Sequence, residues 1–354
     1  MIQLLLLLVN LLMIVAVIAS GICWVKMFRR RRGMPLREKV ESLLPARVQE
    51  RPYRSNADGL AIFVTASIML CTMAVSQQMI SNEFVQRGWI QTVKSDSDSL
   101  AEVETQQVSE PKQISDSATG LDSGPTDSTA AGVTAAGASR HRTERSFIAS
   151  ILANTAAGVI SILISVGWLG LFFRQPLRVI GLWPRREDLV IGLKAALLII
   201  PPVLLINAAL SLLIAYEHQV LNSLAAFATP RVFVTTMLGT ALVTPVVEEL
   251  MLRGLLQGGL QRLGDPPPIA PSEAADGEQA DGWRPVSFWP VFAASGLFAC
   301  MHLGQGAAPI ALFFLSLGMG YLYRQTGNLT GPIVVHMVLN SMTLMVELLK
   351  IQIP

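Results

Sequence analysis

The sequence predicts an all-α protein, a polytopic transmembrane bundle of about eight membrane-spanning helices. Hydrophobic residues make up 51 % of the 354 positions and charged residues only 15 %, whereas an ordinary soluble domain carries about 25 % charged residues. Several apolar runs are long enough to cross the roughly 30 Å hydrocarbon core of a bilayer. The net charge of +2 lacks the basic excess of nucleic-acid-binding proteins, so the expected surroundings are lipid and no nucleic-acid partner is expected.

The first 80 residues hold two predicted spans joined by a basic loop. The run 2–25 exceeds the apolar core of a signal peptide, which is about 7–15 residues long. Lys26 and four consecutive arginines follow it, and basic loops next to spans stay in the cytoplasm. The second span, 60–80, returns the chain to the outer side. We therefore expect an outside N-terminus and a cytoplasmic loop over 33–55.

Residues 81–146 differ in composition from the spans on either side. They are rich in Ser, Thr, Asp, Glu, Ala and Gly and poor in large apolar residues, so they cannot bury a core. We predict a disordered extracytoplasmic linker, with 95–140 outside the cell. The third span, 147–173, and the arginines after it return the chain to the cytoplasm and form a unit that ends at residue 184.

The remaining unit, 185–350, supplies five more predicted spans and carries the polar motifs described below. The loop 264–286 is cytoplasmic by alternation, and the C-terminus lies outside. The whole chain is therefore expected to be a multi-pass integral membrane protein. The five spans are about 189–216, 232–263, 288–303, 309–323 and 329–349.

Ionisable residues inside apolar helices are costly to bury and therefore mark candidate functional sites. Glu248 and Glu249 lie within the fifth span, and Arg253 follows Glu249 by four residues, a spacing that places this pair on one helix face. Glu248 points about 100° away and has no partner in the sequence. Pro245 removes a helix hydrogen bond and is expected to open the helix locally. The alternative for Glu249 and Arg253 is a purely structural ion pair.

Two of the four histidines also fall in apolar spans. His302 lies one turn after Phe298, and His336 lies one turn before Asn340. His302 could instead be a core histidine bonded to a carbonyl. His336 and Asn340 could instead serve only to link helices by hydrogen bonds.

Considered together, these residues match the needs of peptide hydrolysis, which are a water, a base and donors for the developing oxyanion. Glu248 and His302 could hold and activate the water. His336 and Asn340 could donate to the oxyanion. The bracing pair would then be Glu249 and Arg253.

The motifs Glu-Glu-x-x-x-Arg, Phe-x-x-x-His and His-x-x-x-Asn, in this order on successive apolar helices, resemble those of the CPBP family. These are the CAAX-prenyl-protease and bacteriocin-processing intramembrane proteases, also called the Abi or type II CAAX endopeptidase family. All three motifs match without substitution, and the resemblance covers about residues 185–350. It implies an intramembrane endopeptidase that acts on membrane-associated proteins or peptides. We expect it in the cytoplasmic membrane of a bacterium.

The resemblance also implies a role for each motif residue. Glu248 resembles the catalytic glutamate that activates water, and His302 resembles its partner. His336 and Asn340 resemble the oxyanion-stabilising pair. The supporting positions of the family are matched by Glu249 and Arg253.

Three alternatives stay open at this point, and the leading interpretation needs no cofactor. The first is a zinc metalloprotease with Glu and two His as ligands, although the sequence has no His-Glu-x-x-His motif. The second is a non-catalytic membrane protein, such as an immunity factor or scaffold. The third is a proton-coupled transporter, because intramembrane Glu and His also build proton relays.

The depth of His302 in the membrane is a further open question. By simple alternation His302 falls at the outer end of a short span, whereas Glu248 lies in the middle of its helix. Either the sixth helix begins before Phe288, or the turn after His302 lies inside the membrane.

Overall fold

The computed structural model of the chain is helical throughout the part that it describes, without a strand, and this confirms the all-α class. Six helices are long and apolar enough to cross a membrane, and a seventh apolar helix is shorter. Together they indicate a multi-pass integral membrane protein. The described residues are 2–44, 46–47, 56–90, 128–214, 226–227, 229–265 and 285–351.

Helices lie at all eight predicted positions. The long apolar ones are α1 (Ile2–Arg30), α3 (Asn56–Gln86), α5 (Ser128–Gly170), α7 (Arg186–Ser211), the continuous helix from α9 to α11 (Pro230–Gly264) and α14 (Thr330–Ile351). The other two predicted spans form α12 (Trp289–Cys300) and α13 (Ala308–Thr326). Two short helices lie in connections, α2 (Leu36–Glu41) and α6 (Pro176–Val179).

Helical structure extends into both ends of the segment that composition predicts to be disordered, 81–146. α3 continues to Gln86, and α5 already begins at Ser128, while the stretch 91–127 lies outside the described residues. Residues 128–138 are rich in alanine, which has the highest helix propensity. A helix nucleated by the apolar span can therefore extend into this polar sequence at little cost.

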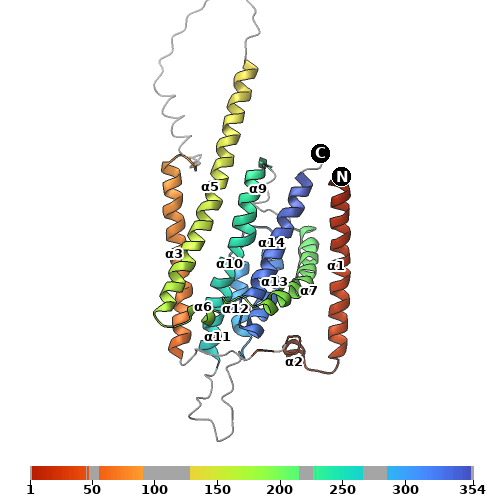
Figure 1. Cartoon of the computed structure of the whole chain (residues 1–354). Coiled ribbons are helices and arrows are strands. Elements are labelled where there is room, and N and C mark those ends of the chain that lie inside the picture. The colour runs from red at the N-terminus through yellow and green to blue at the C-terminus, as the bar shows by residue number, and fades with distance from the viewer. Residues whose placement is uncertain are drawn as a thin grey trace, which may run out of the picture.

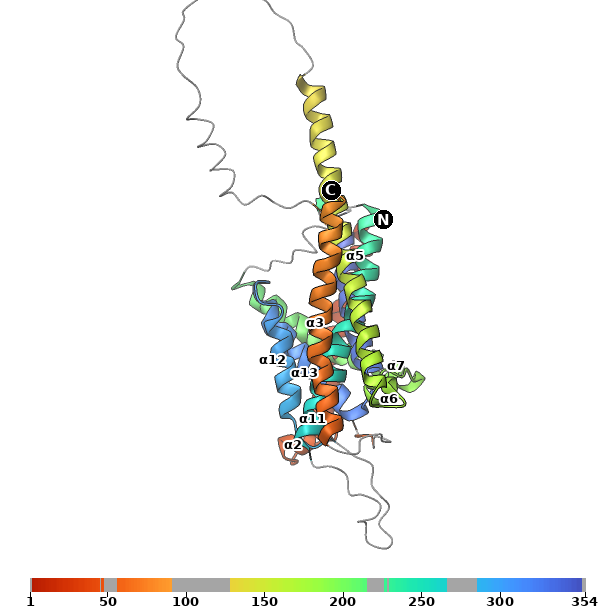
Figure 2. The same cartoon turned by 90° about the vertical axis from the view of Figure 1, so that its left-hand side faces the viewer.

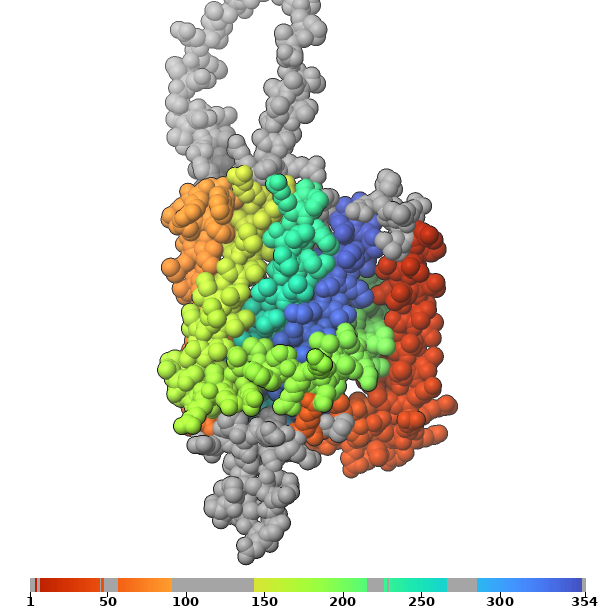
Figure 3. Space-filling view, viewed as in Figure 1, coloured from red at the N-terminus to blue at the C-terminus, as the bar shows by residue number. Residues whose placement is uncertain are grey.

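The start of α1 and the end of α14 lie at one end of the bundle, whereas α2, α6 and the end of α11 lie at the opposite end (Figures 1 and 2). This arrangement matches the alternation expected from the sequence. On the face shown in Figure 3, α5, the helix from α9 and α14 run side by side, with α1 at the edge. In addition, α12 packs against α13, and α3 packs against α5.

The orientation of this bundle in the membrane can be tested by cysteine labelling. We expect a membrane-impermeant thiol reagent on intact cells to label Gly120→Cys but not Ser42→Cys, each in a chain whose three native cysteines are replaced. The reason is that the basic loop after α1 stays in the cytoplasm. Both positions should react after permeabilisation. Labelling of position 42 alone in intact cells would reverse the orientation.

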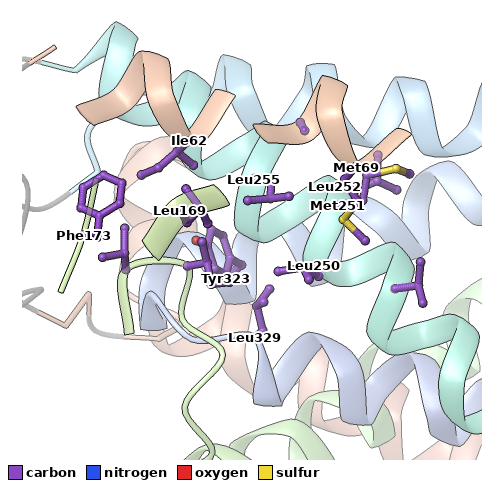
Figure 4. Close-up of a cluster of buried hydrophobic side chains, with 14 of the residues drawn as sticks. Ile62, Met69, Leu169, Phe173, Leu250, Met251, Leu252, Leu255, Tyr323 and Leu329 are labelled. Atoms are coloured by element: carbon purple, nitrogen blue, oxygen red, sulfur yellow. The ribbon is translucent and has the colours of Figure 1, made fainter. Parts of the chain in front are cut away.

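The helix that carries the two glutamates is held by close packing on its neighbours. Leu250, Leu252 and Leu255 are fully buried and pack with side chains of α3 and α5 in one cluster (Figure 4). A Cβ atom at Gly259 would lie 2.8 Å from the Phe63 backbone, so this glycine permits the helices to touch. Because lipid is as apolar as these side chains, such close contact is what associates helices in a membrane.

α1 docks on α7 through one backbone carbonyl. The Ser20 hydroxyl and the Trp24 indole N–H donate to the carbonyl oxygen of Leu198, over 3.2 and 3.0 Å. Pro202, four residues after Leu198, has no N–H with which to bond that carbonyl within the helix. The two side chains of α1 therefore satisfy a group that the proline leaves free.

Candidate active site

The glutamates lie on a helix whose winding is irregular on both sides of them. α10 (Thr244–Glu249) is flanked by two π-helical segments, η1 (Met237–Val243) and η2 (Leu250–Gln257). Such segments insert an extra residue into a turn and are frequent at functional sites. The side chains of α10 therefore leave the helix at angles, about its axis, that differ from those of an uninterrupted α-helix.

Asn340 of α14 supports this irregular backbone. Its Nδ2 donates to the carbonyl oxygen of Thr240 over 3.0 Å. In a π-helical register that carbonyl would pair with the amide five residues later, which belongs to Pro245 and does not exist. The sequence-based role of Asn340 was an oxyanion donor, and the structure shows that one of its two N–H groups is already engaged.

Glu249 and Arg253 form the pair that their spacing predicts. Arg253 Nε lies 3.2 Å from Glu249 Oε2, and both side chains are fully buried. The two atoms are within ion-pair distance, although their alignment does not make a hydrogen bond. Loss of either partner would leave an uncompensated charge in the bundle.

Two other helices hold the guanidinium group of Arg253. Its Nη2 donates to Ser316 Oγ of α13 over 2.8 Å. Its carbon Cζ lies 5.1 Å from the ring centroid of Phe298 on α12, a cation–π contact. Arg253 therefore joins η2, α12 and α13 at one point.

His336 of α14 lies between the two glutamates. Its Nδ1 is 3.0 Å from Glu249 Oε1, and its Nε2 is 3.7 Å from Glu248 Oε2. A carboxylate only accepts hydrogen bonds, so the Glu249 contact assigns the ring proton to Nδ1. The sequence predicts different roles for the two glutamates, catalysis for Glu248 and support for Glu249. In the structure both carboxylates lie beside the same imidazole ring, that of His336.

Glu248 is the accessible carboxylate of the two. Its side chain is 18 % exposed, whereas that of Glu249 is fully buried. It also lies close enough to His302 for a charge interaction. Of the two carboxylates, Glu248 is therefore the one that keeps some accessible surface.

The orientation of His302 follows from its backbone contact. Its Nδ1 lies 2.7 Å from the carbonyl oxygen of Phe298, and a carbonyl only accepts, so Nδ1 carries the proton and Nε2 has the lone pair. The Phe298 ring contacts both histidine rings, with centroid distances of 4.7 Å to His302 and 5.7 Å to His336. Phe298 thus spaces the two imidazoles apart.

The length of α12 bears on the depth of His302. This helix begins at Trp289, and residues 285–288 before it are not helical. Its 12 residues span about 18 Å, less than the roughly 30 Å of a hydrocarbon core. The turn that follows contains Gly304 and Gly306 with positive φ angles and lies partway along the bundle (Figure 2). These features favour the second interpretation, a turn inside the membrane.

The structure brings five of the six predicted site residues into one connected group. Glu248, Glu249, Arg253, His302 and His336 are linked by the contacts above, and Asn340 lies one turn beyond His336 on α14. Among the described residues, no three His, Cys, Asp or Glu side chains are placed to hold a metal ion. Sequence reasoning missed Ser316, because a lone serine in an apolar helix gives no signal of its own.

An apolar cavity of about 220 Å³ lies apart from this group, between α1, α7 and α14. Val338 and Met342 line it from α14, and they point away from the face of that helix that carries His336 and Asn340. None of the six predicted site residues lines it.

Residues 230–342 match the family described as type II CAAX prenyl endopeptidase Rce1-like. The matched range contains all three motifs and runs from the start of α9 into α14. This match confirms the family resemblance that the motifs carry. No curated protein and no solved structure gives a significant match to the chain.

Proposed function

We propose that this chain, whose residues 230–342 are Rce1-like, hydrolyses peptide bonds with a water molecule activated by Glu248 and His302. The family match supports a CAAX-protease-like intramembrane endopeptidase. The observation that carries the residue-level proposal is the contrast between the two glutamates: Glu249 is buried and paired with Arg253, whereas Glu248 is accessible. One carboxylate is thus available for chemistry and the other for support.

The activated water has two acceptors on the protein. With its proton on Nδ1, His302 offers the lone pair of Nε2, and ionised Glu248 offers a carboxylate oxygen. A water that donates to both turns its own lone pair toward the carbonyl carbon of the substrate. Glu248 takes the proton as the oxygen–carbon bond forms, and that proton later passes to the leaving amine when the carbon–nitrogen bond breaks.

Two donors are proposed for the developing oxyanion. Asn340 has a second N–H group beyond the one bonded to the Thr240 carbonyl. His336 lies between Glu248 and Glu249 and becomes a donor through Nε2 when that nitrogen carries a proton. Donors aimed at developing charge in a dry site are usually the largest single contribution to such catalysis.

We propose that the substrates are membrane-associated proteins or peptides, because the site is built within the bundle from the helix that includes α10, from α14 and from the turn after α12. A comparison of membrane proteomes tests the proposal. Cells in which the native gene is replaced by a Glu248→Gln allele should accumulate an uncleaved precursor that wild-type cells lack. Equal precursor levels at equal protein abundance would favour the non-catalytic scaffold instead.

A further inference from the structure

A chain of contacts connects α13 to the proposed catalytic glutamate. It begins at Ser316, whose Oγ accepts from Arg253 Nη2 over 2.8 Å. Arg253 Nε pairs with Glu249 Oε2 at 3.2 Å, and Glu249 Oε1 accepts from His336 Nδ1 over 3.0 Å. His336 Nε2 then faces Glu248 Oε2 at 3.7 Å. Ser316, Arg253, Glu249 and His336 are all buried, and Ser316 belongs to none of the three motifs.

We propose that Ser316 is a positioning residue, which acts through Arg253 and Glu249 to hold His336 with Nδ1 protonated and Nε2 toward Glu248. This inference rests on the proposed function, since it assigns a role within the same site. Ser316 itself touches neither Glu248 nor the reacting atoms.

Ser316 can affect His336 because of which atoms of Arg253 and Glu249 contact each other. A guanidinium and a carboxylate prefer a bidentate contact, with two parallel N–H···O bonds. Here the contact is single, between Nε and Oε2, and Nη2 is bonded to Ser316 instead. Glu249 Oε1 therefore stays available to His336. Without the Ser316 hydroxyl, Nη2 can turn to Glu249 Oε1 and compete with the imidazole for it.

This arrangement fixes which proton of the site is mobile. In the proposed arrangement Glu249 Oε1 holds the proton on His336 Nδ1 in place. When Glu248 Oε2 and His336 Nε2, which lie 3.7 Å apart, close to hydrogen-bond distance, a second proton can pass from the oxygen to the nitrogen. This step breaks an O–H bond and forms an N–H bond. The transfer converts two neutral groups into a carboxylate and an imidazolium, the forms needed for the base and for one oxyanion donor. If His336 turned to the other tautomer, Nε2 would have no lone pair to receive that proton.

The test compares two buried serines. Ser316→Ala removes the hydroxyl that binds Arg253. Ser295→Ala is the matched control, because Ser295 is equally buried on α12 and its hydroxyl has no hydrogen-bond partner among the described residues. We expect Ser316→Ala to lower product formation per folded molecule about tenfold, the effect of losing a hydrogen bond to a charged group. Ser295→Ala should stay at the wild-type rate, and Ser316→Thr, which keeps a hydroxyl, should recover most of it.

A second readout reports the histidine itself. Nitrogen-15 NMR of protein labelled at its four histidines distinguishes Nδ1–H from Nε2–H, and the His336 signals are those that disappear in His336→Gln. We expect Nδ1–H in the wild type and in Ser295→Ala, and a mixture of tautomers in Ser316→Ala. A role in packing alone would not move this equilibrium.

Several results would overturn the proposal. They are an Nε2–H tautomer in the wild type, equal losses of rate in the two alanine variants, or a Ser316→Ala protein with wild-type rate and tautomer. If Ser316→Ala does not fold, two other measurements test the proposal. They are the His336 tautomer of the wild type, expected to be Nδ1–H, and the rate of Ser316→Thr, expected to be close to that of the wild type. The NMR measurement needs no substrate, so it stands even if Glu248→Gln cleaves normally and the proposed function fails.

Discussion

Glu248→Gln is expected to abolish peptide hydrolysis while leaving the amount of folded protein unchanged. The substitution keeps the size and shape of the side chain but removes its capacity to take a proton from water. Loss of a general base typically costs about 10²–10⁴ in rate. Because Glu248 is partly exposed and is not the partner of Arg253, its charge contributes little to folding. Product formation per folded molecule, measured on purified protein, gives the result.

Glu347→Gln is the matched control for this variant. Glu347 also lies on a helix of the bundle, and its side chain is similarly accessible, but within the described ranges its ion-pair partner is Lys350 at the end of α14. It should cleave at the wild-type rate. A Glu248→Gln protein as active as this control would show that the glutamate mechanism is wrong.

Arg253→Ala should fail in a different way, through low abundance of folded protein. The change leaves the Glu249 carboxylate buried without its cation, and breaking a buried pair in this way costs about 3–5 kcal/mol. It also removes the contacts with Ser316 and Phe298 that join three helices. Yield after membrane extraction and the midpoint of thermal unfolding measure the effect.

The control for Arg253→Ala is an arginine that pairs with a glutamate at the same sequence spacing but on the exposed surface. Arg37 and Glu41 are also four residues apart, with side chains 64 % and 39 % exposed. An exposed pair of this kind contributes about 0.3–0.5 kcal/mol, so Arg37→Ala should leave the unfolding midpoint nearly unchanged. Equal losses in the two variants would mean that burial of the Glu249 pair has no special energetic role.

Much of the fold could be predicted because long apolar runs in the sequence identify membrane helices. All eight predicted spans are helices, and the Glu249–Arg253 pair follows from a spacing of four residues. α13 falls outside the six long apolar helices, since it carries buried polar side chains such as Ser316 and Arg324. Those side chains face protein instead of lipid, which hydropathy does not record.

The arrangement of the site was harder to predict because it depends on contacts between distant segments. The two adjacent glutamates that flank His336 lie between two π-helical segments, whereas residue spacing alone assumes a regular α-helix. Pro245 did indicate a local opening, but not an extra residue in the turns on either side. The engagement of Asn340 with the Thr240 carbonyl likewise arises from this winding.

The contact of α1 with the Leu198 carbonyl carries an evolutionary consequence. Two features that look independent in the sequence depend on each other: the first helix can be lost without cost only if position 202 is no longer proline. A descendant that shed α1 would expose an unpaired carbonyl to hydrocarbon, which costs several kcal/mol. Restoring an amide at position 202 would remove that cost. We therefore expect shortened relatives to lack this proline, and those that keep it to retain a hydroxyl or indole donor on a neighbouring helix.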